Sequence, residues 1–252
     1  MKPVKVIVTG ATSGLGRAMA EKFLKIGYEV HFHGRNPKSI LALLKHQRSH
    51  FIRCDLRKID DVQTLAALVR REDIRCFVNN AGIYTNRGEK TPTPLCLDLL
   101  TTNLVAPILI LKDIYKHFKE SGGGTIVNIN SIAGLYPKFE EAVYCASKYG
   151  LRGFSDSLQM EAHKYKVRIL DYYLGALQTS MTRGHEGFDT FIDPKDVAEK
   201  IVSDVTTARS FIAVRQELRK APGLSIGTPL VRSADLGRNG GFEETFQKAQ
   251  KI

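Results

Sequence analysis

The chain has 252 residues, of which 43% are hydrophobic and 25% charged. This composition is typical of globular proteins and excludes a disordered, collagen-like or coiled-coil chain, while the length allows one large α/β domain or two small ones. The formal net charge of +11 comes from Lys and Arg residues spread along the whole chain, a pattern more typical of a solvated surface than of a nucleic-acid-binding patch.

Apolar strands alternate with amphipathic helices along the first 215 residues. In chain order, the pattern predicts strands at 4–8, 28–32, 50–53, 74–78, 125–129, 167–173 and 211–214. Between them it predicts helices at 14–26, 37–46 (a short one), 59–70, within 93–118 (a longer one), 144–165 and 194–207. Parallel neighbours need a crossover of a dozen or more residues, and such crossovers are right-handed. The sequence therefore predicts an α/β fold: a single doubly wound, parallel, seven-stranded sheet of the Rossmann type with helices on both faces.

No linker rich in Pro, Gly or Ser divides residues 1–215, so we expect one domain there. Residues 216–252 contain several glycines and little periodicity, which predicts a loop-rich C-terminal extension of the same domain.

The four cysteines, at positions 54, 76, 96 and 145, form no CxxC pair. We expect reduced thiols and a cytoplasmic location. The most apolar stretch, residues 95–115, is interrupted by charged residues, Asn and Pro, and the N-terminus shows no cleavable signal pattern. We therefore expect no transmembrane helix and no membrane partner.

A glycine-rich turn, TGATSGLG, runs from Thr9 to Gly16 directly after the first predicted strand. Glycines let a phosphate approach the backbone, and the N-terminus of the next helix directs free N–H groups at the anion. The spacing is GxxxGxG and not the more common GxGxxG, and such a turn alone is weak support. Its place between the first strand and the first helix favours a dinucleotide site that includes Gly10, Thr12, Ser13, Gly14, Leu15 and Gly16.

The end of the second strand indicates which dinucleotide is bound. An NAD site generally has an acidic residue there, but this chain reads His33-Gly34-Arg35-Asn36. An arginine suits the 2′-phosphate of NADP, so Arg35 favours NADP(H). His31 and His33 share one face of the strand, but the sequence shows no further ligands beside them, and we expect no metal site.

Ser131 follows the fifth predicted strand, and Tyr144 and Lys148 lie four residues apart on the next helix, hence on one face. A unit charge about 4 Å away, at an effective dielectric near 20, is worth roughly 4 kcal/mol. That amount would lower a phenol pKa from about 10 to about 7, although desolvation opposes it. A YxxxK pair alone is common and usually inert, so its meaning depends on the other motifs.

In combination, these motifs resemble the short-chain dehydrogenase/reductase family over residues 4–215. The resemblance rests on TGATSGLG, Asp55, the NNAG of residues 79–82, Asn103, Ser131, the YCASK of residues 144–148, and Gly175 followed by Thr179. Two positions depart from the family pattern: Leu174 precedes Gly175 where a proline is usual, and Asn130 stands where a serine often precedes the catalytic serine.

The resemblance implies a role for each site residue. Tyr144 would be the general acid or base, Ser131 would orient the substrate carbonyl, Lys148 would hold the nicotinamide ribose and lower the Tyr144 pKa, and Asn103 would support a water-linked proton relay. The dinucleotide would also meet Asp55 and Leu56 near the adenine, Asn80, Ala81 and Gly82 along the cleft, and Gly175 and Thr179 near the carboxamide, with Tyr144 and Lys148 completing the site.

The sequence thus predicts an NADP(H)-dependent oxidoreductase, of the carbonyl reductase or alcohol dehydrogenase type, acting on a small-molecule carbonyl or secondary alcohol. A non-catalytic NADP(H)-binding regulatory protein on the same fold is the alternative, although it would not need the catalytic residues. A nucleic-acid partner is not expected, because no basic helix or RNA-binding signature accompanies the charge.

Residues 84–90, 132–141 and 176–193 are expected to hold the substrate, and the last segment carries Met181, His185, Phe188 and Phe191. Steroids, sugars, acyl thioesters, quinones and small ketones all remain compatible with it. The family resemblance also implies a homodimer or homotetramer formed through the two long helices.

Overall fold

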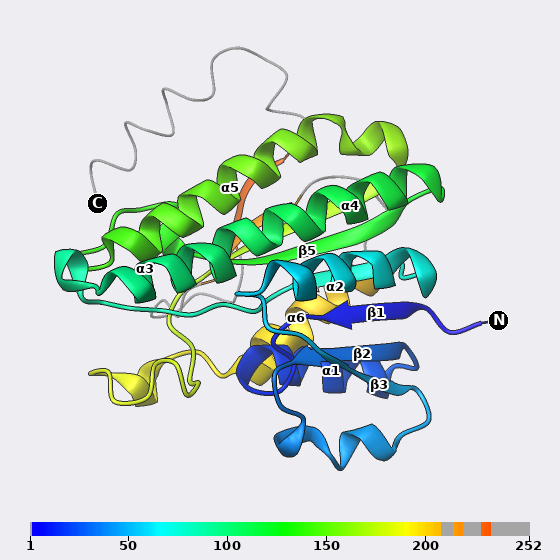
Figure 1. The fold of residues 1–252 in the computed structure, drawn as a ribbon, viewed down its shortest axis with the longest axis horizontal. Coiled ribbons are helices and arrows are strands. Elements are labelled where there is room, and N and C mark those ends of the chain that lie inside the picture. Colours follow the sequence, from blue (N-terminus) through cyan, green and yellow to red (C-terminus); the bar gives the residue numbers. More distant parts are fainter. Residues whose placement is uncertain (1, 208–213, 219–227, 233–252) are drawn as a thin grey trace.

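One eight-stranded sheet runs through the protein in the order β3-β2-β1-β4-β5-β6-β7-β8. The computed structural model describes residues 2–207, 214–218 and 228–232 (Figure 1). The strands are β1 (Lys5–Val8), β2 (Glu29–Gly34), β3 (Ser49–Arg53), β4 (Cys76–Asn79), β5 (Gly124–Ser131), β6 (Val167–Leu174), β7 (Val214–Leu218) and β8 (Thr228–Arg232). All neighbours pair in parallel except β7 and β8, which are antiparallel. The predicted doubly wound parallel sheet is confirmed, and β8 is an additional strand that the sequence pattern did not indicate.

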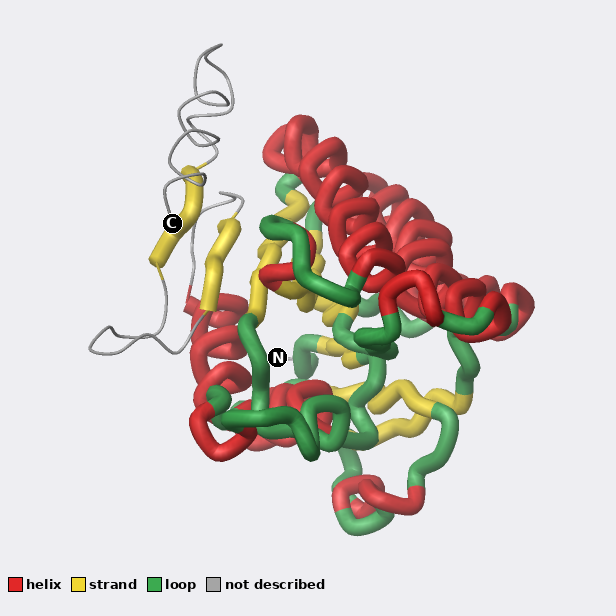
Figure 2. The backbone as a smooth tube through the Cα atoms, turned by 90° about the vertical axis from the view of Figure 1, so that its left-hand side faces the viewer, coloured by secondary structure: helices red, strands yellow, loops and turns green. Residues whose placement is uncertain are grey.

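Helices cover both faces of the sheet, as predicted. They are α1 (Gly14–Lys25), α2 (Ile59–Arg71), α3 (Thr93–Leu100), α4 (Ala106–Glu120), α5 (Ala142–Ala162) and α6 (Pro194–Thr207). Apolar side chains of α1 and α6 bury one face together with Val6, Val30 and Phe32, whereas those of α2, α4 and α5 bury the other with Ile7 and Phe77. Figure 2 shows the strands between these two groups of helices.

The predicted helix at 37–46 is wrong. The segment instead forms two single 3₁₀ turns, η1 (Lys38–Ile40) and η2 (Leu43–Lys45). The first turn closes through the Ile40 N–H and the Pro37 carbonyl, while the Asn36 side chain caps the Lys38 N–H at 2.9 Å. Such short turns suffice to bury Ile40 against the α1 side of the core.

The long helix predicted within 93–118 is present but interrupted. Between α3 and α4 lies a π-helical turn, η4 (Thr101–Val105), that contains Asn103. The combined stretch Thr93–Glu120 is long and apolar enough to cross a membrane by length and composition, in contrast to the sequence-based expectation. A core helix meets the same criterion, and Leu99, Ile110 and Phe118 are buried in this fold. The absence of a membrane partner stays a prediction.

The last predicted strand lies slightly further along the chain than expected. β7 begins at Val214, whereas the pattern placed the strand at 211–214, of which 211–213 lie outside the described residues. The predicted loop-rich segment 216–252 contains the end of β7 and all of β8, and its remaining residues also lie outside the described part of the chain.

A buried polar network connects β4, β5 and β6 to α5. The buried Asp171 carboxylate accepts hydrogen bonds from Asn128 (2.9 Å), Ser155 (2.8 Å) and Gln159 (2.6 Å), and Asn79 donates to Asn128 (3.3 Å). Burial raises the pKa of Asp171 to about 6, against the pull of these donors. The network ties α5 to the strands whose carboxyl ends carry the residues described below.

This network predicts a specific pH dependence of stability. Because the folded protein keeps the Asp171 proton to a higher pH than the unfolded chain, the stability from this group is greatest below its ordinary pKa of 3.8 and is lost as the pH rises through about 6. The difference in unfolding free energy between wild type and Asp171→Asn should therefore fall by about 2 kcal/mol between about pH 4.5 and pH 7. Urea unfolding at both pH values measures it.

Asp189→Asn removes a carboxylate from an exposed position and is the matched control. The difference in unfolding free energy between Asp189→Asn and wild type should stay constant over the same pH range. If the difference between Asp171→Asn and wild type were also constant with pH, this would contradict the raised pKa of Asp171.

Candidate active site

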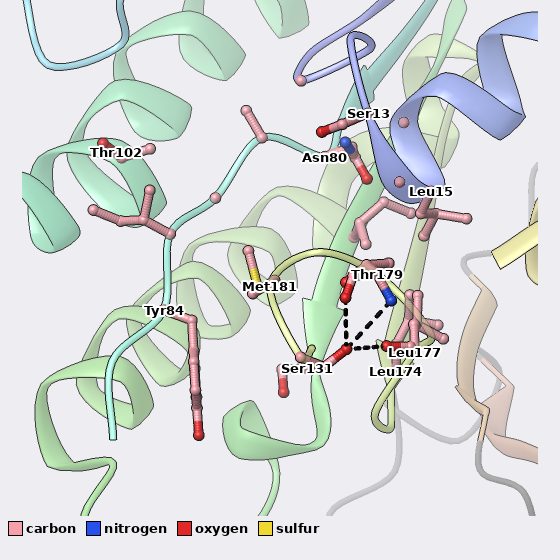
Figure 3. Close-up of a pocket in the computed structure, with 18 of the residues that line it drawn as sticks. Ser13, Leu15, Asn80, Tyr84, Thr102, Ser131, Leu174, Leu177, Thr179 and Met181 are labelled. Atoms are coloured by element: carbon pink, nitrogen blue, oxygen red, sulfur yellow. Dashed lines mark hydrogen bonds between the residues drawn. The ribbon is translucent and has the colours of Figure 1, made fainter. Parts of the chain in front are cut away.

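A cavity of about 540 Å³ opens at the carboxyl ends of the parallel strands, where the strand order reverses between β1 and β4 (Figure 3). Open α/β sheets bind ligands at this switch point. The cavity is lined by Gly10, Thr12, Ser13, Gly14, Leu15, Gly16, Arg35, Asp55, Leu56, Asn80, Ala81, Gly82, Ser131, Tyr144, Lys148, Gly175 and Thr179. The structure thus brings together every predicted site residue except Asn103.

Close packing fixes the glycine-rich turn. A side chain at Gly16 would overlap the Asn80 amide and the Gly10 carbonyl, so no other residue fits there. Thr9 joins this turn to the end of β4, because its hydroxyl accepts the N–H groups of Asn80 (2.8 Å) and Ala81 (2.9 Å). The two loops on either side of the switch point are therefore held as one unit.

The first turn of α1 offers free N–H groups to the cavity. Its N-cap residue, Ser13, makes no side-chain capping bond, and the turn carries no acidic residue. A helix N-terminus in this state is an anion-binding site. It suits the pyrophosphate of a dinucleotide.

His33 is a cavity residue that the sequence analysis considered only as a metal ligand. Its Nδ1 accepts the Gly10 N–H at 3.1 Å, and burial lowers its pKa to about 4. The ring is therefore neutral and can act as this acceptor. Its place at the end of the second strand, one residue before Gly34, was the only signal in the sequence.

Basic side chains gather where β2 and β3 end. Arg35 is exposed and lines the cavity, and Arg57 lines it as well. Arg57 binds the Asp55 carboxylate through Nη2 (2.7 Å) and Nε (3.0 Å), which lowers the pKa of Asp55 to about 2, and Arg35 adds to the lowering. Arg57 was not predicted, although it lies only two residues beyond Asp55. The predicted contact of Asp55 with adenine stays a prediction.

The three proposed catalytic side chains converge at the end of β5. Ser131 hydrogen-bonds to Tyr144, in the first turn of α5. One turn later, the buried Lys148 donates from Nζ to the Ile129 carbonyl at 3.3 Å and lies 5.7 Å from the centre of the Tyr144 ring. Figure 3 labels Ser131, Thr179 and Tyr84 among the residues that line this cavity.

The pKa values of Tyr144 and Lys148 differ from the expectation that Lys148 lowers the pKa of Tyr144. Burial raises the pKa of Tyr144 to about 12, although the Ser131 hydrogen bond opposes this, and burial lowers the pKa of Lys148 to about 8. Both groups lose hydration, and this loss is the largest cause of each shift. Tyr144 is consequently a protonated phenol at neutral pH, so it can donate a proton.

Asn103 lies behind the cavity. Its side chain accepts the Ile83 N–H (2.9 Å) and donates to the Ile83 carbonyl (2.8 Å) and to Ser147 (3.4 Å). It therefore positions the Ala81-Gly82 loop against η4. The proton relay stays a prediction; because the side-chain amide is committed to Ile83, such a relay would use the backbone of the π turn, where the regular hydrogen-bond pattern is broken.

Asn130, one of the departures from the family pattern, has a defined role. Its Oδ1 accepts the Ser131 N–H (2.8 Å), and its Nδ2 donates to the Lys148 carbonyl (3.2 Å). The side chain thus connects the end of β5 to α5, and so fixes Ser131 relative to Tyr144 and Lys148.

The three predicted substrate segments all reach the cavity. They contribute, among others, Tyr84, Lys138, Glu141, Met181, His185 and Phe191, while Phe188 does not line it. The Tyr84 hydroxyl donates to Glu141 at 2.9 Å, and its ring lies 5.0 Å from that of Tyr144 and 5.8 Å from that of His185. The wall beside Tyr144 therefore combines aromatic rings with one carboxylate.

Comparisons with known proteins agree with this site. The profile of the family described as "short chain dehydrogenase" matches residues 4–187. Carbonyl reductase family member 4 of Xenopus laevis is 30% identical over 207 residues, which cover 77% of this chain and 88% of the relative.

Two solved structures show the same fold with a dinucleotide present. A metagenomic short-chain oxidoreductase in complex with NADP is 28% identical, with a TM-score of 0.72 over 85% of this chain and 96% of the other. A 4-hydroxyisoleucine dehydrogenase complexed with NADH is 25% identical, with a TM-score of 0.75 over 81% of this chain and 91% of the other. The chain belongs to the short-chain dehydrogenase family of oxidoreductases.

Proposed function

We propose that the protein is an NADP(H)-dependent reductase that converts a small-molecule carbonyl compound to a secondary alcohol. The observation that carries this proposal is the hydrogen-bonded pair of Ser131 and Tyr144, with Lys148 one helical turn further, beside a cavity lined by the glycine-rich turn. NADPH bound in this cavity would supply the hydride.

The chain's own residues provide the rest of the reaction. The Ser131 hydroxyl would hydrogen-bond the substrate carbonyl oxygen and hold it near the Tyr144 phenol. As negative charge develops on that oxygen, Tyr144 would donate its proton, which stabilises the transition state more than the bound ketone. The Lys148 ammonium would bind the ribose hydroxyls of the cofactor and place positive charge behind the tyrosine.

The raised pKa of Tyr144 is compatible with its proposed role as the proton donor in reduction. A phenol with a pKa of about 12 holds its proton at neutral pH and is ready to act as an acid. Alcohol oxidation would require the same group as a phenolate, which this buried environment disfavours.

The preference for NADP(H) over NAD(H) rests on Arg35. It follows the end of β2, where an NAD enzyme usually carries a carboxylate, and its exposed guanidinium lines the cavity. The similar structure that contains NADP supports this choice, although another relative binds NADH.

A homo-oligomer in the cytoplasm completes the proposal. Leu97 of α3 and Val105 of η4 are exposed apolar residues, as are Tyr149 and Met160 of α5, which supports self-association through these helices. All four cysteines are free thiols, as expected in a reducing compartment.

Tyr144→Phe tests the proton donor. The variant should lose at least about 100-fold in kcat for every carbonyl substrate found in a panel assayed by NADPH absorbance. Its NADPH affinity, measured by calorimetry, should stay within about twofold of wild type, because the cavity keeps its shape.

Tyr149→Phe, on the same helix but with its hydroxyl on the Leu135 carbonyl outside the cavity, is the matched control. It should keep the wild-type rate. Full activity of Tyr144→Phe would show that another group donates the proton, and wild-type binding of NADPH without any turnover would favour the regulatory alternative.

Arg35→Asp tests cofactor choice. Replacing the guanidinium by a carboxylate should repel the 2′-phosphate and accept the ribose hydroxyls of NADH, so the ratio of kcat/KM for NADPH to that for NADH should fall at least about tenfold. Lys45→Asp makes the same charge change at an exposed position of η2 and should leave the ratio unchanged. An unaltered ratio in Arg35→Asp would refute the 2′-phosphate assignment.

The rate of reduction should depend on pH through Lys148. Burial lowers the pKa of this ammonium to about 8, whereas Tyr144 stays protonated to about 12. The initial rate should therefore be level up to about pH 8 and fall as Lys148 loses its proton. The side chain that the Lys148→Arg variant carries at this position stays charged. The variant should therefore be slower than wild type, and its rate should not decline between pH 8 and pH 10. A wild-type rate that is level to pH 10 would contradict this assignment.

A further inference from the structure

Three potential metal ligands lie together at the end of the sheet opposite the cavity. Glu29 and His31 are two residues apart on β2 and so share one face, and His50 pairs directly with His31 across the β2–β3 register. All three lie near the amino ends of their strands, in the part of the sheet that Figure 1 labels β2 and β3. No role in the proposed reaction uses them.

The distances suit one small ion. One ligand atom from each residue lies within 4.8 Å of the others. Glu29 Oε1 is 3.1 Å from His50 Nε2 and 3.9 Å from His31 Nε2. Tetrahedral Zn²⁺ bonds nitrogen and oxygen at about 2.0 to 2.2 Å, which places neighbouring ligand atoms roughly 3.4 Å apart. Small side-chain rotations would bring the three atoms to that spacing.

His31 supplies an independent indication of a missing partner. Its side chain is buried, with 5% of the residue exposed, and its Nε2 has no hydrogen-bond partner among the described residues. A buried polar atom without a partner is costly, and such atoms often mark an ion or water site.

Lys5 is the group that opposes a cation here. Its Nζ lies 3.4 Å from Glu29 Oε1 and 3.3 Å from Glu72 Oε2. The ammonium competes for the Glu29 carboxylate and repels a second positive charge. When the Glu29 carboxylate binds an ion, Lys5 can keep its ion pair with Glu72. Lys5 therefore lowers the affinity of the site for a cation but does not prevent binding.

We propose that Glu29, His31 and His50 bind one divalent transition-metal ion, with Zn²⁺ as the best match to two imidazoles and a carboxylate. Three protein ligands leave the fourth position to water, on the side where the His50 side chain is 45% exposed. Because the active-site cavity lies at the other end of the strands, the ion would join β2 to β3 and would take no part in hydride transfer.

The test uses untagged, chelator-treated full-length protein and Zn²⁺ in competition with a chromogenic chelator at about pH 7.5. Wild type should bind one ion per chain. His50→Gln should bind at least tenfold more weakly, as should Glu29→Gln, and Lys5→Gln should bind more tightly because a competing charge is gone. His163→Gln removes an exposed imidazole that lies outside the cluster and should bind as wild type does.

Two further readouts are independent of activity. Co²⁺ in place of Zn²⁺ should give wild type, but not His50→Gln, the visible absorption of a four-coordinate ion. Zn²⁺ should raise the unfolding temperature of wild type and not that of His50→Gln. Equal Zn²⁺ affinity in wild type, His50→Gln and Glu29→Gln would overturn the proposal, and so would the lack of any bound ion in both wild type and Lys5→Gln. Each result is separate from the reductase proposal, because none depends on turnover.

Discussion

The hydrogen bond between Ser131 and Tyr144 depends on how the end of β5 is held against α5. Asn130 makes this connection, since it bonds to the Ser131 N–H on one side and to the Lys148 carbonyl on the other. Deeper in the sheet, Asp171 ties the same helix to the same strands through Asn128 and Ser155. The arrangement of Ser131, Tyr144 and Lys148 is therefore set by buried amides and a carboxylate, and the surface loops complete the cavity around it.

The same burial that fixes this geometry also sets the chemistry. Lys148 and Tyr144 are both removed from water, and each is shifted toward its neutral form, to a pKa of about 8 and about 12. A pair in this state suits proton donation, because the phenol keeps its proton and the ammonium is still charged at neutral pH. The sequence-based expectation rested on the attraction between the two groups, whereas desolvation is the main cause of both pKa shifts.

Much of the fold and most of the cavity lining follow from local patterns in the sequence. Continuous apolar runs at β1 and β6 and the glycine turn before α1 could be placed because each depends on residues adjacent in the chain. The helix expected at 37–46 could not, because whether a short apolar segment forms an α-helix or two 3₁₀ turns depends on the core that it meets. The orientation of Asn103 toward Ile83 depends on a contact 20 residues away in the chain, and the spacing of a motif does not contain that information.

The face of β2 that carries Glu29, His31 and His33 shows how one strand can serve two sites. His33, near the carboxyl end, uses Nδ1 to accept the Gly10 N–H and so supports the dinucleotide turn. His31, two residues earlier, is also buried, and its Nε2, like that of His33, has no hydrogen-bond partner among the described residues. Its neighbour across the sheet is His50 of β3, a pairing that the alternation within one strand does not reveal. The two imidazoles of β2 therefore differ in their neighbours, because the glycine-rich turn brings the Gly10 N–H to His33, whereas the sheet register brings His50 of β3 to His31.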